Sequence, residues 1–252
     1  MRKSSTAGFR RRVLRRTVLA VVGVVALGAA TTTASVAYVR SAGTEVSSIA
    51  LTSKPQPNVR DDAFDISRLG GWGLPGLSHA SVDADASATA NSECDGCDAT
   101  ATTLSIVYLD GARTGNFDNV AAAWNKECTQ GCASTSVSVQ VVIGSSRLVK
   151  KVSANNRALS LNLLCSGCRA SSEAFQLVML TPKGKTLSWR DVRDLRNFIN
   201  SRVAALSAPA TPSLRAAPQA STDAALEQLE SQGASALGGA TTLESNADVQ
   251  RS

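Results

Sequence analysis

The chain has 252 residues, a formal net charge of +6, six cysteines and a single histidine. Seven basic residues precede residue 17, which leaves 19 Lys and Arg against 20 Asp and Glu in the rest of the chain. The remainder therefore carries no sustained basic patch that could neutralise phosphates, and this argues against a nucleic-acid partner.

The N-terminus has the pattern of an export signal or a membrane anchor. Residues 1–16 form a basic segment, and residues 17–39 form an uncharged, largely apolar run. The run is long enough to span a bilayer, whereas Ser35 and Ala37 fit positions −3 and −1 of a cleavage site. We expect a single-pass cell-membrane protein whose membrane contact is residues 17–39, with residues 1–16 cytoplasmic and the rest outside. If the run is cleaved, we expect a secreted protein.

Residues 40–90 are rich in Ala, Ser, Asp and Gly, and we interpret them as a flexible linker. Its glycine-rich part is Gly70–Gly76. The linker also holds His79, which we interpret as a solvated loop residue. Without a second histidine, the chain offers no Cys-His or Ser-His-Asp catalytic constellation.

All six cysteines lie in a threefold repeat within a predicted domain of residues 91–205. The pairs are Cys94 and Cys97, Cys128 and Cys132, and Cys165 and Cys168. Equivalent positions before the pairs include Ser87, Ala121 and Ala158 (position −7) and Asn91, Asn125 and Asn162 (position −3). Ten residues after each pair lie Val107, Val142 and Val178. Units of such a repeat bury their apolar faces against one another.

The segments after each pair alternate with a period of two, which predicts strands. Their apolar positions are Leu104, Ile106, Tyr108, Val139, Val141, Ile143, Phe175, Leu177 and Met179. The alternate face carries Ser105, Gln140 and Gln176, and we predict that this face looks outward and offers a partner surface.

The segments before the pairs have helical spacing, as in Phe117, Ala121, Trp124 and Cys128. Helix, cysteine turn and strand would then repeat three times, with parallel strands and all helices on one face. The predicted fold is an α/β open layer of about three such repeats. A C-terminal helix over 189–206, with Ser188 and Asp191 as a capping box, would close it. Residues 206–252 have few large apolar groups, so we expect a disordered tail.

Three chemistries fit paired cysteines: a redox site, zinc ligation or structural disulfides. A thioredoxin-like pair opens a helix, whereas these pairs would close one. Zinc would leave one of three pairs over, and export to an oxidising compartment disfavours free thiolates. We predict three local disulfides, because neighbouring helices would hold cysteines of different units beyond the roughly 7 Å Cα limit.

The third unit, residues 165–178, resembles a motif of uncharacterised exported actinobacterial proteins, in which repeated Cys-x-x-Cys pairs precede an Ala-Phe-Gln-Val-Val-like run. The resemblance covers residues 119–180. It implies export and a repeat, and no catalytic residues.

The sequence thus predicts a non-enzymatic exported or membrane-anchored cell-envelope protein that displays a disulfide-clipped domain to an unknown protein or envelope partner. No catalytic residue, cofactor or metal is assigned. The alternatives are an envelope thiol-disulfide oxidoreductase and a zinc-binding module.

Overall fold

The structure, a computed structural model, describes residues 42–70, 81–182, 184–208 and 218–252. Its elements in chain order are β1 (Ala42–Leu51), β2 (Asn58–Leu69), β3 (Ser81–Ser92), β4 (Asp98–Leu109), β5 (Thr114–Asn125), β6 (Ala133–Ser145), β7 (Lys151–Asn162), β8 (Arg169–Thr181), α1 (Trp189–Ser207), α3 (Pro218–Ala236) and β9 (Thr241–Arg251).

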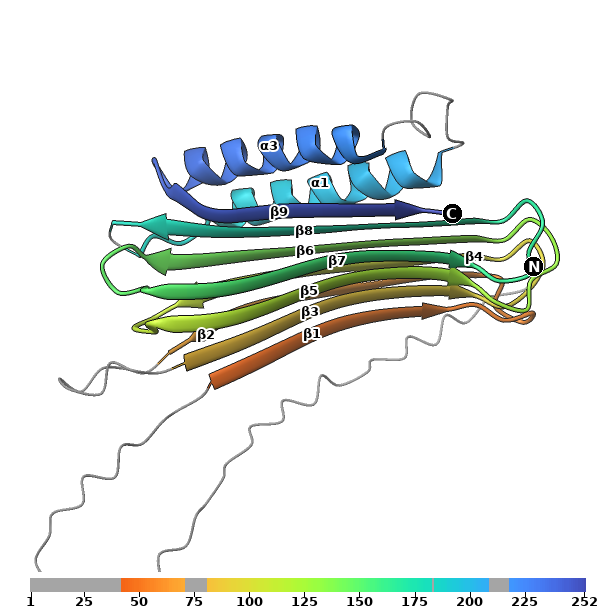
Figure 1. Ribbon diagram of the computed structural model, residues 1–252, viewed down its shortest axis with the longest axis horizontal. Coiled ribbons are helices and arrows are strands. Elements are labelled where there is room, and N and C mark those ends of the chain that lie inside the picture. Colours follow the sequence, from red (N-terminus) through yellow and green to blue (C-terminus); the bar gives the residue numbers. More distant parts are fainter. Residues whose placement is uncertain (1–41, 71–80, 183, 209–217) are drawn as a thin grey trace, which may run out of the picture. The chain divides into compact units, whose positions relative to one another are not determined.

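The strands form two sheets, and strands β1 to β8 alternate between them along the chain (Figure 1). One sheet has the order β1-β3-β5-β7, the other β2-β4-β6-β8-β9. All neighbouring strands are parallel except β8 and β9. We call the first sheet the odd sheet and the second, which includes β9, the even sheet. Each strand of the odd sheet leads through a short turn to the next strand of the even sheet, so β1–β2, β3–β4, β5–β6 and β7–β8 each form one coil. Such successive coils of parallel strands make a β-solenoid.

The predicted α/β layer of helix–strand repeats is therefore wrong. The segments expected to be helices are the strands β3, β5 and β7. In β5 the buried side includes Phe117, Asn119, Ala121 and Asn125, at a spacing of two. Two of these inward residues are asparagines, so the inward side of β5 is not uniformly apolar and its period of two was not recognised. The alanines of the segment also favoured the helix prediction.

The strands predicted after the cysteine pairs are present as β4, β6 and β8, and they are parallel as expected. Val107, Val142 and Val178 stand in register, as their common position in the repeat predicted. These valines share one side of the sheet with Gln140 and Gln176, and that side faces the other sheet. The side interpreted as an outer polar face is the interior of the solenoid.

In β3, β5 and β7, the repeat positions that we aligned in the sequence match the observed strand register only in part. Asn125 pairs with Asn162, as predicted, but Asn91 pairs with Trp124. The first unit is thus displaced by one residue before the cysteines. A displacement of one residue exchanges the inward and outward faces of a strand, so Asn91 and Asn125 lie on opposite faces.

The space between the sheets is lined by small residues at the cysteine end and by larger ones at the other end. The small cluster is Ala50, Ala88, Ala90, Ala99 and Ala101, and the larger one includes Leu69, Val107, Leu109, Phe117, Val142 and Val178. The short cysteine turns join the sheets directly, so small inward side chains suit the close approach there.

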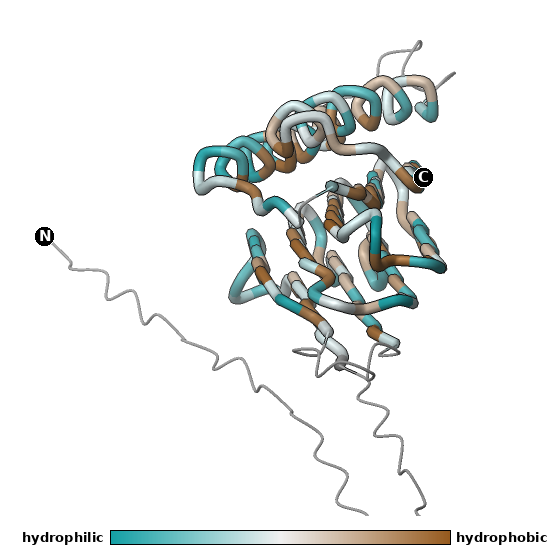
Figure 2. The backbone as a smooth tube through the Cα atoms, turned by 90° about the vertical axis from the view of Figure 1, so that its left-hand side faces the viewer, coloured by the Kyte–Doolittle hydropathy of each residue, from teal (hydrophilic) through white to brown (hydrophobic). Residues whose placement is uncertain are grey.

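The outer face of the even sheet is covered by α1 and α3 (Figures 1 and 2). The apolar residues predicted to meet helices do so, but the helices come from the C-terminal region. The capping box of Ser188 and Asp191 is confirmed at the start of α1. Its predicted stripe of Val192, Leu195 and Ile199 is buried.

The C-terminal region from residue 218 is ordered structure, which corrects the expected disordered tail. Pro218 opens α3, a favoured place for proline because the first helical N–H has no acceptor. Gly233 lets α3 approach the sheet closely, since a Cβ there would lie 2.7 Å from Sδ of Met179. β9 then pairs with β8 and satisfies the backbone of that edge.

The predicted linker at residues 40–90 contains β1, β2 and most of β3, so it belongs to the solenoid. The alternation of Val82, Ala84, Ala86 and Ala88 with polar residues is a strand pattern that the alanine-rich composition obscured. His79 and residues 71–76 of the glycine-rich part lie outside the described residues, as do residues 1–41.

In the part of the chain that the structure describes, neither helix is long and apolar enough to cross a bilayer. This finding corrects the prediction of a single-pass cell-membrane protein with the membrane as its partner. The segment on which that prediction rested, residues 17–39, lies outside the described residues.

Candidate functional site

The three cysteine turns lie at one end of the solenoid, where β3, β5 and β7 lead into β4, β6 and β8. The structure joins the cysteines within each turn, with Cα–Cα separations of 5.4 Å for Cys94–Cys97, 6.4 Å for Cys128–Cys132 and 5.7 Å for Cys165–Cys168. All three separations lie in the usual disulfide range. The six cysteines thus form a column of local pairs along one edge of the fold.

Backbone hydrogen bonds stack these turns on one another. The amide of Gly96 donates to the carbonyl of Gln130 at 3.0 Å, and the amide of Arg169 donates to the carbonyl of Cys132 at 2.8 Å. Ser166 and Thr129 are joined in the same way at 3.2 Å. The turns therefore follow the strand stacking and hold their side chains in register.

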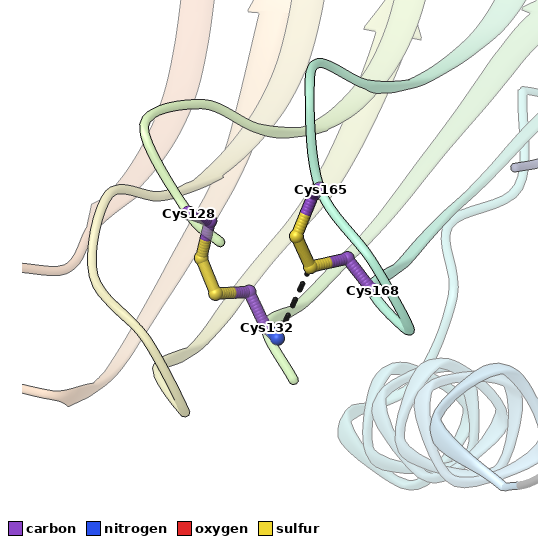
Figure 3. Close-up of side chains that lie close together, drawn as sticks. All are labelled: Cys128, Cys132, Cys165 and Cys168. Carbon is purple, nitrogen blue, oxygen red and sulfur yellow. Dashed lines mark hydrogen bonds between the residues drawn. A yellow bond between two sulfur atoms is a disulfide. The ribbon is translucent and has the colours of Figure 1, made fainter. Parts of the chain in front are cut away.

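Stacking brings cysteines of different turns close together (Figure 3). The four sulfurs of Cys128, Cys132, Cys165 and Cys168 all lie within 4.8 Å of one another. We predicted that separate units hold their cysteines too far apart because helix spacing was assumed for the repeat. Strands stack at only about 4.8 Å, so the predicted separation between units is wrong, although each disulfide lies within one turn as predicted.

Left-handed backbone conformations shape the second and third turns. Gly131 and Gly167, directly before the second cysteine of each pair, have φ of 71° and 67°. Glu127 and Leu164, directly before the first cysteine, have φ of 60° and 55°. Non-glycine residues rarely adopt this conformation, so surrounding structure must hold it in place. Both turns use it at the same point to aim their first cysteine.

Asp95 links the first turn to the second. Its carboxylate accepts hydrogen bonds from the backbone amides of Thr129 and Gln130 at 2.6 Å and 3.0 Å, and from the Thr129 hydroxyl. The hydroxyl and amide donors of Thr129, with that of Gln130, lower the pKa of Asp95 because they stabilise its charged form.

The predicted partner surface of Ser105, Gln140 and Gln176 is fully buried between the sheets. Gln140 donates to the carbonyl of Ala84 at 3.0 Å, and Gln176 donates to the carbonyl of Phe117 at 2.9 Å. These side chains tie the even sheet to the odd sheet. The expectation that this face looks outward is corrected, because the second sheet covers it.

Buried asparagines make the matching ties from the odd strands. Nδ2 of Asn119 donates to Oδ1 of Asn156 at 2.7 Å and to the carbonyl of Phe175 at 2.9 Å. Asn125 likewise donates to Asn162 at 2.6 Å and to the carbonyl of Arg169 at 2.9 Å. The recurrence of asparagine at these positions was visible in the sequence, but their inward direction was not.

Among the described residues, α1 and α3 both pack on the even sheet, and no helix packs on the outer face of the odd sheet. Toward the cysteine turns this face exposes Ile49, Leu51, Leu159 and Leu161. Farther along the strands, Glu45, Asp85 and Asp118 stand in register as an exposed acidic column. Desolvation, together with repulsion from Asp118 and Glu45, raises the pKa of Asp85.

The fold and the cysteine column define a small β-solenoid with an interior cross-linked by amide side chains and an edge closed by paired cysteines. Comparison with protein-family models, curated proteins and solved structures found no match.

Proposed function

We propose that the chain is an exported, non-enzymatic display protein whose β-solenoid is held by structural disulfides. The cysteine column is the observation that carries the proposal. All six cysteines lie in local pairs, and none is free in the described structure. Disulfides persist in oxidising compartments outside the cytoplasm. The basic segment and apolar run at residues 1–39 support export as well.

A structural role explains the polar residues of the interior. Asn119, Asn125, Gln140 and Gln176 bond to backbone carbonyls and to one another. Each of these side chains is buried, so none of them meets a substrate in solution. These side chains link neighbouring coils and the two sheets. Any contact with a partner must therefore use the outer surface.

The face that the solenoid would display is the outer side of β1, β3, β5 and β7. The parallel register arranges its residues in straight columns, apolar toward the cysteine turns and acidic farther along. The opposite sheet is covered by α1 and α3. In the described part of the chain this sheet face has no helix packed on it, and an open sheet face suits display to a partner better than catalysis.

The test is the thiol status of the exported protein. The full-length gene is expressed in a bacterial host, and the protein is collected from the extracytoplasmic fraction and alkylated before or after reduction. We expect no alkylated cysteine before reduction and six afterwards. Free thiols in protein that has been exported would contradict the structural disulfides, and retention of the whole chain in the cytoplasm would contradict export.

A further inference from the structure

The second and third cysteine turns together place four sulfurs where one metal ion could sit. Cys128, Cys132, Cys165 and Cys168, hereafter the four-cysteine cluster, keep every sulfur within 4.8 Å of the others. Tetrahedral zinc with Zn–S bonds of about 2.3 Å needs sulfurs roughly 3.8 Å apart. Reduction lengthens the two bonded sulfur separations, and small rotations of the side chains equalise the rest.

We propose that the four-cysteine cluster, once its two disulfides are reduced, binds one Zn²⁺ through four thiolates. This inference goes beyond the proposed function, because it concerns a second chemical state of the same edge. Four thiolates in tetrahedral array are a ligand set that zinc prefers. The cluster would then clamp neighbouring coils together, where the disulfides close each turn separately.

The scaffold of the cluster does not depend on the disulfides. The two turns are joined by backbone hydrogen bonds from Ser166 to Thr129 and from Arg169 to Cys132. The left-handed residues Glu127 and Leu164 hold equivalent positions and direct both first cysteines to the same side. These features lie in the turns, and the pairing of β5 with β7 and of β6 with β8 holds the two turns side by side without the sulfur–sulfur bonds.

The surroundings suit a charged sulfur site. The backbone amide of Cys132 donates to Sγ of Cys168 at 3.4 Å (Figure 3), an interaction that stabilises a thiolate. Cys128 and Cys132 are buried, whereas Cys165 and Cys168 are half-buried. One side of the cluster is therefore sheltered, and the other lets a metal ion enter.

The chemistry balances with a dithiol as reductant. Each disulfide takes two electrons and two protons from one dithiol, which leaves as its own disulfide, and four protein thiols result. Zinc then binds four thiolates and displaces four protons. The zinc–thiolate complex has a net charge of −2, and together with the four released protons this equals the +2 charge of the added zinc ion.

The first turn provides a matched control within the chain. Cys94 and Cys97 belong to no four-ligand group among the described residues, and Sγ of Cys94 lies 3.9 Å from Oγ1 of Thr52. Changing Cys94→Ser and Cys97→Ser should leave zinc binding intact. Changing Cys128→Ser and Cys165→Ser removes one ligand from each turn of the cluster and should abolish tight binding.

The experiment uses the full chain, reduced by a phosphine and freed of reductant without air. Zn²⁺ is added and the stoichiometry is read by native mass spectrometry, while Co²⁺ serves as a spectroscopic probe. We expect one metal per chain, with the visible bands of tetrahedral cobalt–thiolate, in the wild type and in the first-turn variant. We expect loss of that metal in the Cys128→Ser/Cys165→Ser variant.

Alkylation mapping of the unaltered chain keeps the test decisive if a variant fails to fold. Alkylation rates are compared with and without Zn²⁺: the metal should slow the reaction of the half-buried Cys165 and Cys168, whereas the rates of Cys94 and Cys97, which are buried in either state, should not change. No metal uptake by the reduced wild type, whether folded or unfolded, would overturn the inference, as would alkylation rates of Cys165 and Cys168 that Zn²⁺ leaves unchanged. Neither result bears on whether the exported protein is oxidised, so the two proposals fail separately.

Discussion

Gln176 donates a hydrogen bond from Nε2 to Oε1 of Gln140, 2.7 Å away in the neighbouring coil. Both side chains are buried, and each also donates to a carbonyl of the opposite sheet. A bond between side chains at the same repeat position links coil to coil, while the bonds to carbonyls link sheet to sheet. The interior is thus held by amides as well as by apolar contacts.

The first prediction concerns this pair of glutamines. Gln140→Ala leaves the carbonyl of Ala84 and the amide of Gln176 without their partner, so it should lower the free energy of unfolding by about 1–3 kcal/mol. A double-mutant cycle with Gln176→Ala should show coupling of about 1 kcal/mol. Urea unfolding under non-reducing conditions measures both. If Gln140→Ala costs no more than the exposed substitution Ser153→Ala, the residue is not an interior tie.

The second prediction concerns the asparagine ladder. Asn119→Ala removes donors to Asn156 and to two backbone carbonyls, so we expect a loss of about 1–3 kcal/mol in the free energy of unfolding. Asn155→Ala is the matched control, because Asn155 is exposed on the neighbouring strand. It should change stability by less than about 0.5 kcal/mol. Equal effects of the two substitutions would show that Asn119 does not face inward.

The third prediction concerns the attachment of α1 to the sheet. Arg202 donates two hydrogen bonds, of 2.8 Å and 2.6 Å, to the fully buried carboxylate of Glu173. Arg202→Ala leaves that charge with Thr222 as its remaining side-chain partner and should cost about 3–5 kcal/mol in thermal or urea unfolding.

Two further variants distinguish a buried pair from a surface pair. Arg202→Met combined with Glu173→Met removes both charges and should be less harmful than Arg202→Ala alone. Arg68→Ala breaks the exposed pair with Asp110 and should cost at most about 1 kcal/mol. The assignment fails if breaking the exposed pair costs as much as breaking the buried one.

The fourth prediction is a pH dependence at the acidic column. The pKa of Asp85 is raised, first by desolvation and then by Asp118 and Glu45, so the folded state holds the Asp85 proton more tightly than the unfolded state does. Ionised Asp85 therefore destabilises the fold at pH 7. This cost declines as the pH falls through the raised pKa and is absent below the unfolded value of about 3.9.

Asp85→Asn should accordingly stabilise the protein at pH 7, and the gain should disappear near pH 3. Unfolding curves at several pH values measure the difference between the variant and the wild type. Ser153→Ala, an uncharged change on the same outer face, should give a difference that does not vary with pH. A stabilisation by Asp85→Asn that persists at pH 3 would exclude an electrostatic origin.

The sequence correctly predicted those parts of the fold that are determined by residues close to one another along the chain. The period of two after each cysteine pair predicted strands β4, β6 and β8, and the Ser188–Asp191 spacing predicted the start of α1. In both cases the structure depends on side chains within a few residues of one another. The same holds for cysteines that pair across a single turn.

The rest depended on interactions between distant segments. Asn119 and Gln140 are buried because carbonyls of other strands accept their amides, and no local pattern marks a polar residue as inward. The alanines of β3 face a narrow interior between two sheets, although alanine alone favours a helix. The region from Pro218 onward is held in place by packing and pairing against β8. Its low content of large apolar residues therefore led to the wrong prediction of disorder.

The stacking of coils in register is the central claim, and one cross-linking measurement tests it directly. Ser87 of β3 and Val120 of β5 are register partners on the outer face, whereas Ala121 faces inward. Adjacent strands are about 4.8 Å apart, within disulfide range. The exported Ser87→Cys/Val120→Cys variant should form the new cross-link, seen by non-reducing peptide mapping, and Ser87→Cys/Ala121→Cys should not. The reverse result would contradict the register, and no cross-link in either folded variant would contradict the solenoid.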